Sequence, residues 1–193
     1  EWSGALVANF LMERGNTNNL SFGIEADAQL RRDNERYDDR TTLNAAYNFG
    51  QSGGGPGDGD IQTDTDNWLL NGKYDNFWTN ELYGYVTAKL EHDRIADLYY
   101  RVTPGVGLGY QWFETPKRKF NTEAGISYIH EEFDPSGTND SAALRLAYHY
   151  TNELSDTVSL FHNLEFLPAV DARDDYLLNT DLGLRMKFTE SFF

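Results

Sequence analysis

The fold is decided by one twelve-residue segment, Leu20-Ser21-Phe22-Gly23-Ile24-Glu25-Ala26-Asp27-Ala28-Gln29-Leu30-Arg31. Apolar side chains stand at every second position, whereas the positions between them include Glu25, Asp27 and Arg31. A repeat of two residues is typical of a β-strand with one apolar face, since a helix would repeat about every 3.6 residues. The segment therefore predicts a strand whose two faces meet different surroundings.

The same alternation continues along the chain, and helical spacing is nearly absent. Turn-rich segments separate the alternating stretches, so we expect about ten strands that are connected in order. The expected fold class is all-β, an antiparallel up-and-down transmembrane β-barrel that forms a single domain over residues 1–193. The expected strands are Trp2–Glu13, Leu20–Arg31, Thr41–Phe49, Asn67–Tyr74, Leu82–Glu91, Val102–Trp112, Phe120–Tyr128, Ala142–Tyr150, Thr157–Leu167 and Tyr176–Phe188.

The bulk composition excludes several classes of protein. The 193 residues carry a net charge of −15, which would repel the phosphates of a nucleic acid. There is no cysteine, so a disulfide framework, a thiol nucleophile and Cys-ligated zinc are excluded. No apolar run approaches the roughly 20 residues that a membrane helix needs. The chain opens at Glu1 without an apolar leader, so we expect that any signal peptide has been removed.

The aromatic residues of the apolar face gather near the ends of the expected strands. Tyr176 and Phe188, for example, enclose Leu182 and Leu184. Tyrosine and tryptophan favour the two interfaces of a membrane, and aliphatic side chains favour its hydrocarbon zone. We therefore expect a location in the outer membrane of a Gram-negative bacterium, with lipid and lipopolysaccharide as partners. The expected interface residues are Tyr110, Trp112, Tyr148, Tyr150, Tyr176 and Phe188.

The polar face of the expected strands is nearly balanced in charge. Its acids are Glu13, Glu25, Asp27, Glu91, Glu123, Glu131, Glu165 and Asp181, and its bases are Arg31, Lys73, Lys89, Arg101, Arg145, Arg185 and Lys187. Such a balance suits a narrow lumen, where an unpaired charge is costly. The residues expected to line that lumen are Glu25, Asp27, Glu123, Arg145, Glu165, Asp181 and Arg185.

The connections are expected to differ between the two ends of the strands. Gly50–Asp66 is long and rich in glycine and aspartate, and Glu132–Asp140 is moderately long. Phe113–Lys119 and Thr151–Asp156 are short and fall at the opposite end, although Arg32–Asp39 there is longer. Outer-membrane barrels have short periplasmic turns and longer extracellular loops, so this asymmetry favours that class.

Four short motifs carry a resemblance to a known family. They are Gly15-Asn16-Thr17, Lys73-Tyr74-Asp75, Asp93-Arg94, and Arg101 followed by Pro104-Gly105-Val106-Gly107-Leu108-Gly109-Tyr110. They resemble the salt-induced outer membrane protein family, a domain family of unknown function. The resemblance spans most of the chain and implies an outer-membrane barrel of twelve strands. It implies no established activity and no catalytic residues.

The end of the chain departs from that family's pattern. Thr189–Phe193 reads as a turn that opens an eleventh strand, and Phe193 is a poor closing residue because Thr189 and Ser191 share its face. We therefore expect that two closing strands are missing from this chain.

Few residues are candidates for chemistry. Asp58, Asp60, Asp64 and Asp66 could bind Ca²⁺ through oxygen ligands, but the spacing lacks the glutamate that closes an EF-hand, and a solvated acidic loop is the alternative. Other cofactors are not expected. The candidates for catalysis are His149, His162, Ser127, Ser141 and Ser159. The sequence has no G-x-S-x-G motif around these serines, so no catalytic residue is assigned and no enzyme is expected.

The glycines of the Arg101 motif have the G-x-G spacing of a nucleotide-binding loop, but their structural context excludes that interpretation. Gly105, Gly107 and Gly109 alternate with apolar residues in an expected strand, and no helix follows as a dinucleotide loop requires. Positions without a side chain on the polar face instead relieve crowding or allow strand coiling.

The expected function is an integral, porin-like outer-membrane barrel with a structural role or a narrow channel for small solutes. One alternative is a soluble or peripheral β-barrel that binds a small apolar ligand. Another is an envelope interaction module that docks a partner protein through its acidic outer loops.

Overall fold

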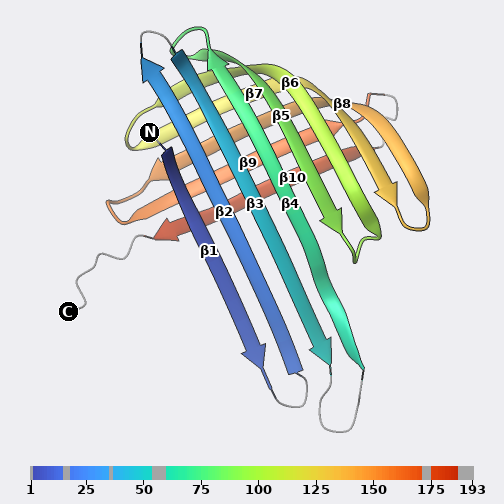
Figure 1. The fold of residues 1–193 in the computed structure, drawn as a ribbon. Helices are drawn as coiled ribbons and strands as arrows, with labels where there is room; N and C mark the ends of the chain where they lie inside the picture. The colour runs from blue at the N-terminus through green and yellow to red at the C-terminus, as the bar shows by residue number, and fades with distance from the viewer. Residues whose placement is uncertain (1, 15–17, 35–36, 54–59, 171–174, 187–193) are drawn as a thin grey trace, which may run out of the picture. The chain divides into compact units, whose positions relative to one another are not determined.

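The computed structural model describes residues 2–14, 18–34, 37–53, 60–170 and 175–186. These residues form ten β-strands, and they contain no helix long and apolar enough to cross a membrane. The strands, labelled in Figure 1, are β1 (Trp2–Glu13), β2 (Asn18–Asn34), β3 (Tyr37–Gly53), β4 (Ile61–Phe77), β5 (Leu82–Asp93), β6 (Leu98–Glu114), β7 (Arg118–Phe133), β8 (Gly137–Glu153), β9 (Val158–Pro168) and β10 (Tyr176–Met186).

Each strand pairs with its neighbours in the chain, in the order β1 to β10 within one sheet. The pairing is antiparallel, and its register brings like residues together. Ile24 of β2 lies opposite Ala8 of β1 and Tyr47 of β3, while Asp27 lies opposite Asn44. The prediction of an all-β fold with ten up-and-down antiparallel strands is confirmed.

Strands β2 to β8 are longer than the alternation predicted, and the connections between them are correspondingly shorter, whereas β1 has the predicted bounds. The prediction that residues Arg32–Asp39 form a long connection was wrong. Strand β2 continues to Asn34 and β3 begins at Tyr37, so only residues 35–36 lie between them. The long loop contracts to residues 54–60, and the loop expected at Glu132–Asp140 contracts to 134–136. The ends of these strands carry polar residues on both faces, so their period of two was not visible in the sequence.

The connections still differ between the two ends of the strands. Connections that follow even-numbered strands are no longer than four residues, at 35–36, 78–81, 115–117 and 154–157. Those that follow odd-numbered strands vary more: 14–17, 94–97 and 134–136 have three or four residues, and 54–60 and 169–175 have seven.

The chain forms two compact units, and strands β4 to β8 each contribute residues to both. Unit 1 comprises Glu1–Tyr74, Thr87–Pro104 and Ile129–Asp140, and unit 2 comprises Asp75–Val86, Gly105–Tyr128 and Ser141–Phe193. The units do not follow one another along the chain, because the boundary crosses strands rather than a linker.

Burial in unit 2 is inverted relative to a soluble core. Along β7, Glu123 is 4 % exposed and Ser127 is 5 % exposed, whereas Ile126 between them is 61 % exposed. Strand β8 repeats the pattern, with Arg145 buried and Leu144 exposed. The polar face of these strands is therefore packed, and the apolar face is open.

Unit 1 has the same exposed apolar face. Leu43 of β3 and Leu70 of β4 are exposed on that face, whereas β1 is exposed on both of its faces. On the opposite face, Glu131 of β7 is buried. Asp, Glu, Lys and Arg on the apolar face stand toward the strand ends, for example Arg32 of β2 and Arg118 of β7, whereas His162 stands in the middle of β9.

Candidate functional site

A buried ion network occupies the polar face of unit 2. The guanidinium of Arg145 on β8 donates from Nη1 to Glu123 Oε2 on β7 at 2.7 Å, and from Nε to Glu165 Oε1 on β9 at 2.6 Å. The side chains of Glu123 and Arg145 are 0 % and 6 % exposed, and that of Glu165 is 23 % exposed. Adjacent strands place these three groups side by side because all of them lie at polar-face positions.

Two tyrosines of β5 complete the network. The Tyr83 hydroxyl donates to Glu123 Oε1 at 2.8 Å, and the Arg145 guanidinium lies 4.9 Å from the centre of the Tyr85 ring. Both oxygens of Glu123 therefore accept a hydrogen bond, which a fully buried carboxylate requires. His149 Nε2 lies 3.9 Å from the same carboxylate.

Glycines on β6 make room for the two tyrosine rings. A Cβ atom at Gly109 would stand 2.1 Å from Tyr83 Cζ, and one at Gly107 would stand 2.6 Å from the Tyr85 hydroxyl. Gly125 on β7 is equally close to Tyr85, at 2.4 Å. Of the three glycines for which relief of crowding or strand coiling was expected, Gly107 and Gly109 therefore relieve crowding on the polar face.

The polar face of unit 2 is therefore filled rather than hollow. The Tyr83 ring packs on Phe77 with their centres 4.8 Å apart, and Ala143 and Ala147 are buried on β8. The charged groups are paired with one another and the aromatic rings pack against them, so this face of unit 2 is suited to be a rigid, charge-paired filling.

Unit 1 holds a smaller ion network on its own polar face. Arg101 Nε on β6 donates to Glu131 Oε1 on β7 at 2.6 Å, and Arg101 lies 3.8 Å from Glu91 on β5. Glu91 also pairs with Lys89 at 3.2 Å, and the second oxygen of Glu131 accepts from Asn139 at 3.1 Å.

The seven predicted lumen residues separate into groups. Glu123, Arg145 and Glu165 meet in the network described above. Asp181 accepts from Asn163 at 3.4 Å, and Arg185 lies 5.3 Å from the centre of the Phe161 ring. In unit 1, Asp27 accepts from Asn44 at 2.5 Å, and Glu25 is exposed. That all seven line one lumen stays a prediction.

The predicted interface aromatics lie on the apolar face of unit 2. Trp112 is exposed and donates to Thr122 at 3.0 Å, with its ring 4.8 Å from that of Tyr110. Tyr148 contacts His162, Tyr150 packs against Phe120, and the exposed Tyr176 packs against Phe166. Phe188 lies outside the described residues.

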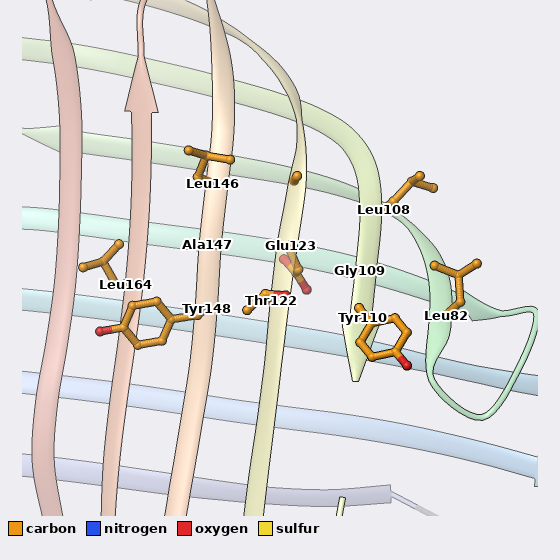
Figure 2. A pocket seen from close by; sticks show the side chains of 11 residues that line it. Leu82, Leu108, Gly109, Tyr110, Thr122, Glu123, Leu146, Ala147, Tyr148 and Leu164 are labelled. Atoms are coloured by element: carbon orange, nitrogen blue, oxygen red, sulfur yellow. The ribbon is translucent and has the colours of Figure 1, made fainter. Parts of the chain in front are cut away.

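An open groove of about 430 Å³ runs over this apolar face. Figure 2 shows Leu146, Leu164 and Tyr148 on one side of Thr122, and Leu108, Tyr110 and Leu82 on the other. Ala124 lines the groove beside Thr122, so β7 has short side chains there while β6 and β8 carry long ones.

Of the candidates for metal binding and catalysis, Asp66 and His162 have structural partners, and Asp60 and Asp64 are exposed. Asp66 on β4 pairs with Arg94 at 3.6 Å, and Asp58 lies outside the described residues. Within the described ranges, no three His, Asp or Glu side chains are grouped as metal ligands. His162 bridges Tyr148 and Thr180, and so occupies a place among the aromatic residues.

Sequence reasoning missed Tyr83 and Tyr85, which the structure places at the centre of unit 2. The sequence indicates them only indirectly. Large rings on the polar face of β5 need positions without side chains on the neighbouring strand, and the alternating glycines of β6 provide these positions. It also missed the buried carboxylate of Asp39, which accepts from Arg32 at 2.8 Å and from Tyr74 at 3.1 Å near the connection at 35–36.

Fold and site together define an all-β protein of ten up-and-down antiparallel strands with a packed, charge-paired polar face. The chain belongs to the family described as Protein of unknown function, DUF481, whose model matches residues 8–193. No match was found among curated proteins or among solved structures. The family description names no activity.

Proposed function

We propose that this protein is an integral β-barrel of the Gram-negative outer membrane, with a narrow, charge-paired interior and a structural or small-solute role. The observation that carries the proposal is the inverted burial of unit 2. A buried Glu123–Arg145–Glu165 network lies on one face, and exposed Leu108, Ile126 and Leu144 lie on the other. Lipid is the solvent that favours that exposure.

The runner-up, a soluble barrel around an apolar ligand, would need the opposite burial. Its interior would hold the aliphatic side chains, and its charges would face water. Here the aliphatic side chains Ile126 of β7 and Leu144 of β8 are exposed, and Arg145 on the opposite face of β8 is buried. Water contact over so large an apolar surface is unfavourable, at roughly 25 cal/mol per Å².

Strand length and connection length also support a membrane barrel. The strands have 11 to 17 residues, and about 9 to 11 suffice to cross a bilayer at a tilt. The connections after even-numbered strands are uniformly short, as periplasmic turns are. We therefore assign that end of the strands to the periplasm.

A lysine at Ile126 tests the proposal. The substitution Ile126→Lys should destabilise the protein folded in lipid vesicles, reducing its free energy of unfolding by at least about 2 kcal/mol. The reason is that the lysine charge would stand in hydrocarbon. In a soluble protein the same change at a side chain that is 61 % exposed would be nearly neutral. Urea titration of refolding into phosphatidylcholine vesicles measures the difference.

The matched control is Ile95→Lys, in the connection that follows β5. Ile95 is also exposed, but it lies outside the strands, so its replacement should change stability little in either case. Equal and small effects at both positions would contradict the membrane proposal.

The filled interior makes a second prediction, about conductance. In planar bilayers we expect small single-channel currents with weak ion selectivity, because Glu123 and Glu165 are paired with Arg145 and rings of Tyr83 and Tyr85 fill the space beside them. Large, strongly selective channels would show that the interior is open.

A further inference from the structure

We propose that the apolar groove of unit 2 binds one anionic phospholipid, with an acyl chain in the groove and the phosphate at Lys117 and Arg118. The inference rests on the proposed membrane location and adds a specific ligand to it. Three features carry it: the shape of the groove, the aromatic residues at one end of it, and a basic turn beyond them.

The groove has the form of a channel between two ridges. Leu108 and Tyr110 of β6 form one ridge, and Leu146 and Tyr148 of β8 form the other (Figure 2). Ala124 between them leaves a depression along β7. Its lining is largely aliphatic, so it suits a hydrocarbon chain rather than a polar solute.

Aromatic residues lie between the groove and the turn after β6. Trp112 follows Tyr110 on the apolar face of β6, and Phe120 precedes Thr122 on that of β7. The indole of Trp112 donates to the Thr122 hydroxyl at 3.0 Å, so it stands beside the groove. Tryptophan at such a position is typical of the level where acyl chains meet headgroups.

The turn itself is basic. Lys117, Arg118 and Lys119 form the chain's one run of three consecutive basic residues, in a protein whose net charge is −15. Lys119 pairs with Glu114 at 3.8 Å, whereas in the described part of the chain the side chains of Lys117 and Arg118 have no ion-pair partner. Two cations therefore remain to attract an anion.

Arg118 lies in line with the groove. It shares the apolar face of β7 with Phe120, Thr122 and Ala124, in that order from the turn. At about 3.3 Å per residue, Arg118 stands roughly 13 Å along the strand from Thr122. One lipid molecule can span that separation, with its headgroup at the turn and its chain at Ala124.

The turn also identifies the leaflet. It follows an even-numbered strand and so belongs to the end with uniformly short connections, which we assign to the periplasm. Glu114 pairs with Lys119 at 3.8 Å, and the backbone N–H of Glu153 donates to the Lys117 carbonyl, which holds the turn in place. The occupant is therefore a glycerophospholipid rather than lipopolysaccharide.

Fluorescence quenching tests the site. In a variant with Trp2→Phe, Trp68→Phe and Trp78→Phe, Trp112 is the remaining indole. Brominated phosphatidylglycerol in phosphatidylcholine vesicles should quench it several-fold more effectively than brominated phosphatidylcholine at equal content. Each basic residue near a membrane surface contributes about fivefold to anion preference, so Lys117→Gln with Arg118→Gln should remove most of it.

The controls separate the possible failures. Lys119→Gln should change the preference less, because Lys119 is already paired with Glu114. Equal quenching by both lipids in the parent would overturn the site and leave the membrane proposal intact. No quenching by any brominated lipid would overturn both. Stronger quenching by brominated lipid A than by phosphatidylglycerol would show that the chosen occupant is wrong.

Discussion

Replacing Arg145 with methionine should lower the free energy of unfolding by about 3 to 5 kcal/mol. The change would leave Glu123 and Glu165 facing each other without the cation between them, and the Glu123 side chain is completely buried. A buried charge without its partner costs far more than the ion pair contributes, because its hydration is not recovered. Denaturant unfolding in detergent or vesicles measures the loss.

Two further variants make this result specific. Arg94→Met removes an arginine whose side chain is 67 % exposed and whose partner Asp66 is 3.6 Å away, so it should cost less than about 1 kcal/mol. Adding Glu123→Gln and Glu165→Gln to Arg145→Met should recover part of the lost stability. If Arg145→Met and Arg94→Met cost the same, the network is not the buried centre of unit 2.

Leucine at Gly109 should be nearly as destabilising, at about 3 kcal/mol or more, the upper end of what overpacking costs. Even its Cβ would stand 2.1 Å from Tyr83 Cζ. The ring cannot easily yield, because Tyr83 is fully buried, packs on Phe77 and donates to Glu123. The same unfolding measurement applies, with thermal melting as a second readout.

Gly72 provides the matched control. It is also a strand glycine, on β4, but the nearest atom to a Cβ there is Leu43 Cδ2 at 3.7 Å, an ordinary contact. Gly72→Leu should therefore change stability little. Tyr83→Ala in the Gly109→Leu background should restore part of the loss, and a purely additive double variant would contradict the proposed contact.

Much of the fold could be predicted because one physical rule governs it. A strand with one apolar and one polar face must alternate its residues, and the ten strands from Trp2 to Met186 follow from that pattern. The strand ends could not be predicted. Near Arg32 and Asp66 both faces of the strand are polar. These residues extend the β-sheet, but the sequence shows no alternation of apolar and polar residues there.

The site could be predicted only in part. Glu123, Arg145 and Glu165 were found because opposite charges on the polar faces of adjacent strands are expected to pair where they are buried. Their tyrosine partners were not found, since the contacts of Tyr83 and Tyr85 with Gly107 and Gly109 depend on the register between β5 and β6, which alternation does not give. Alternation gives the face of a residue, whereas register gives its neighbours.

The pairing of each strand with its chain neighbour has a consequence for how such a protein can change over evolutionary time. Because β1 to β10 pair strictly in order, any two consecutive strands and the connection between them form one β-hairpin. Duplicating or deleting one hairpin rejoins an up strand to a down strand and preserves every other pair. A gene for this architecture can therefore widen or narrow its sheet two strands at a time, without redesign of the remaining hairpins.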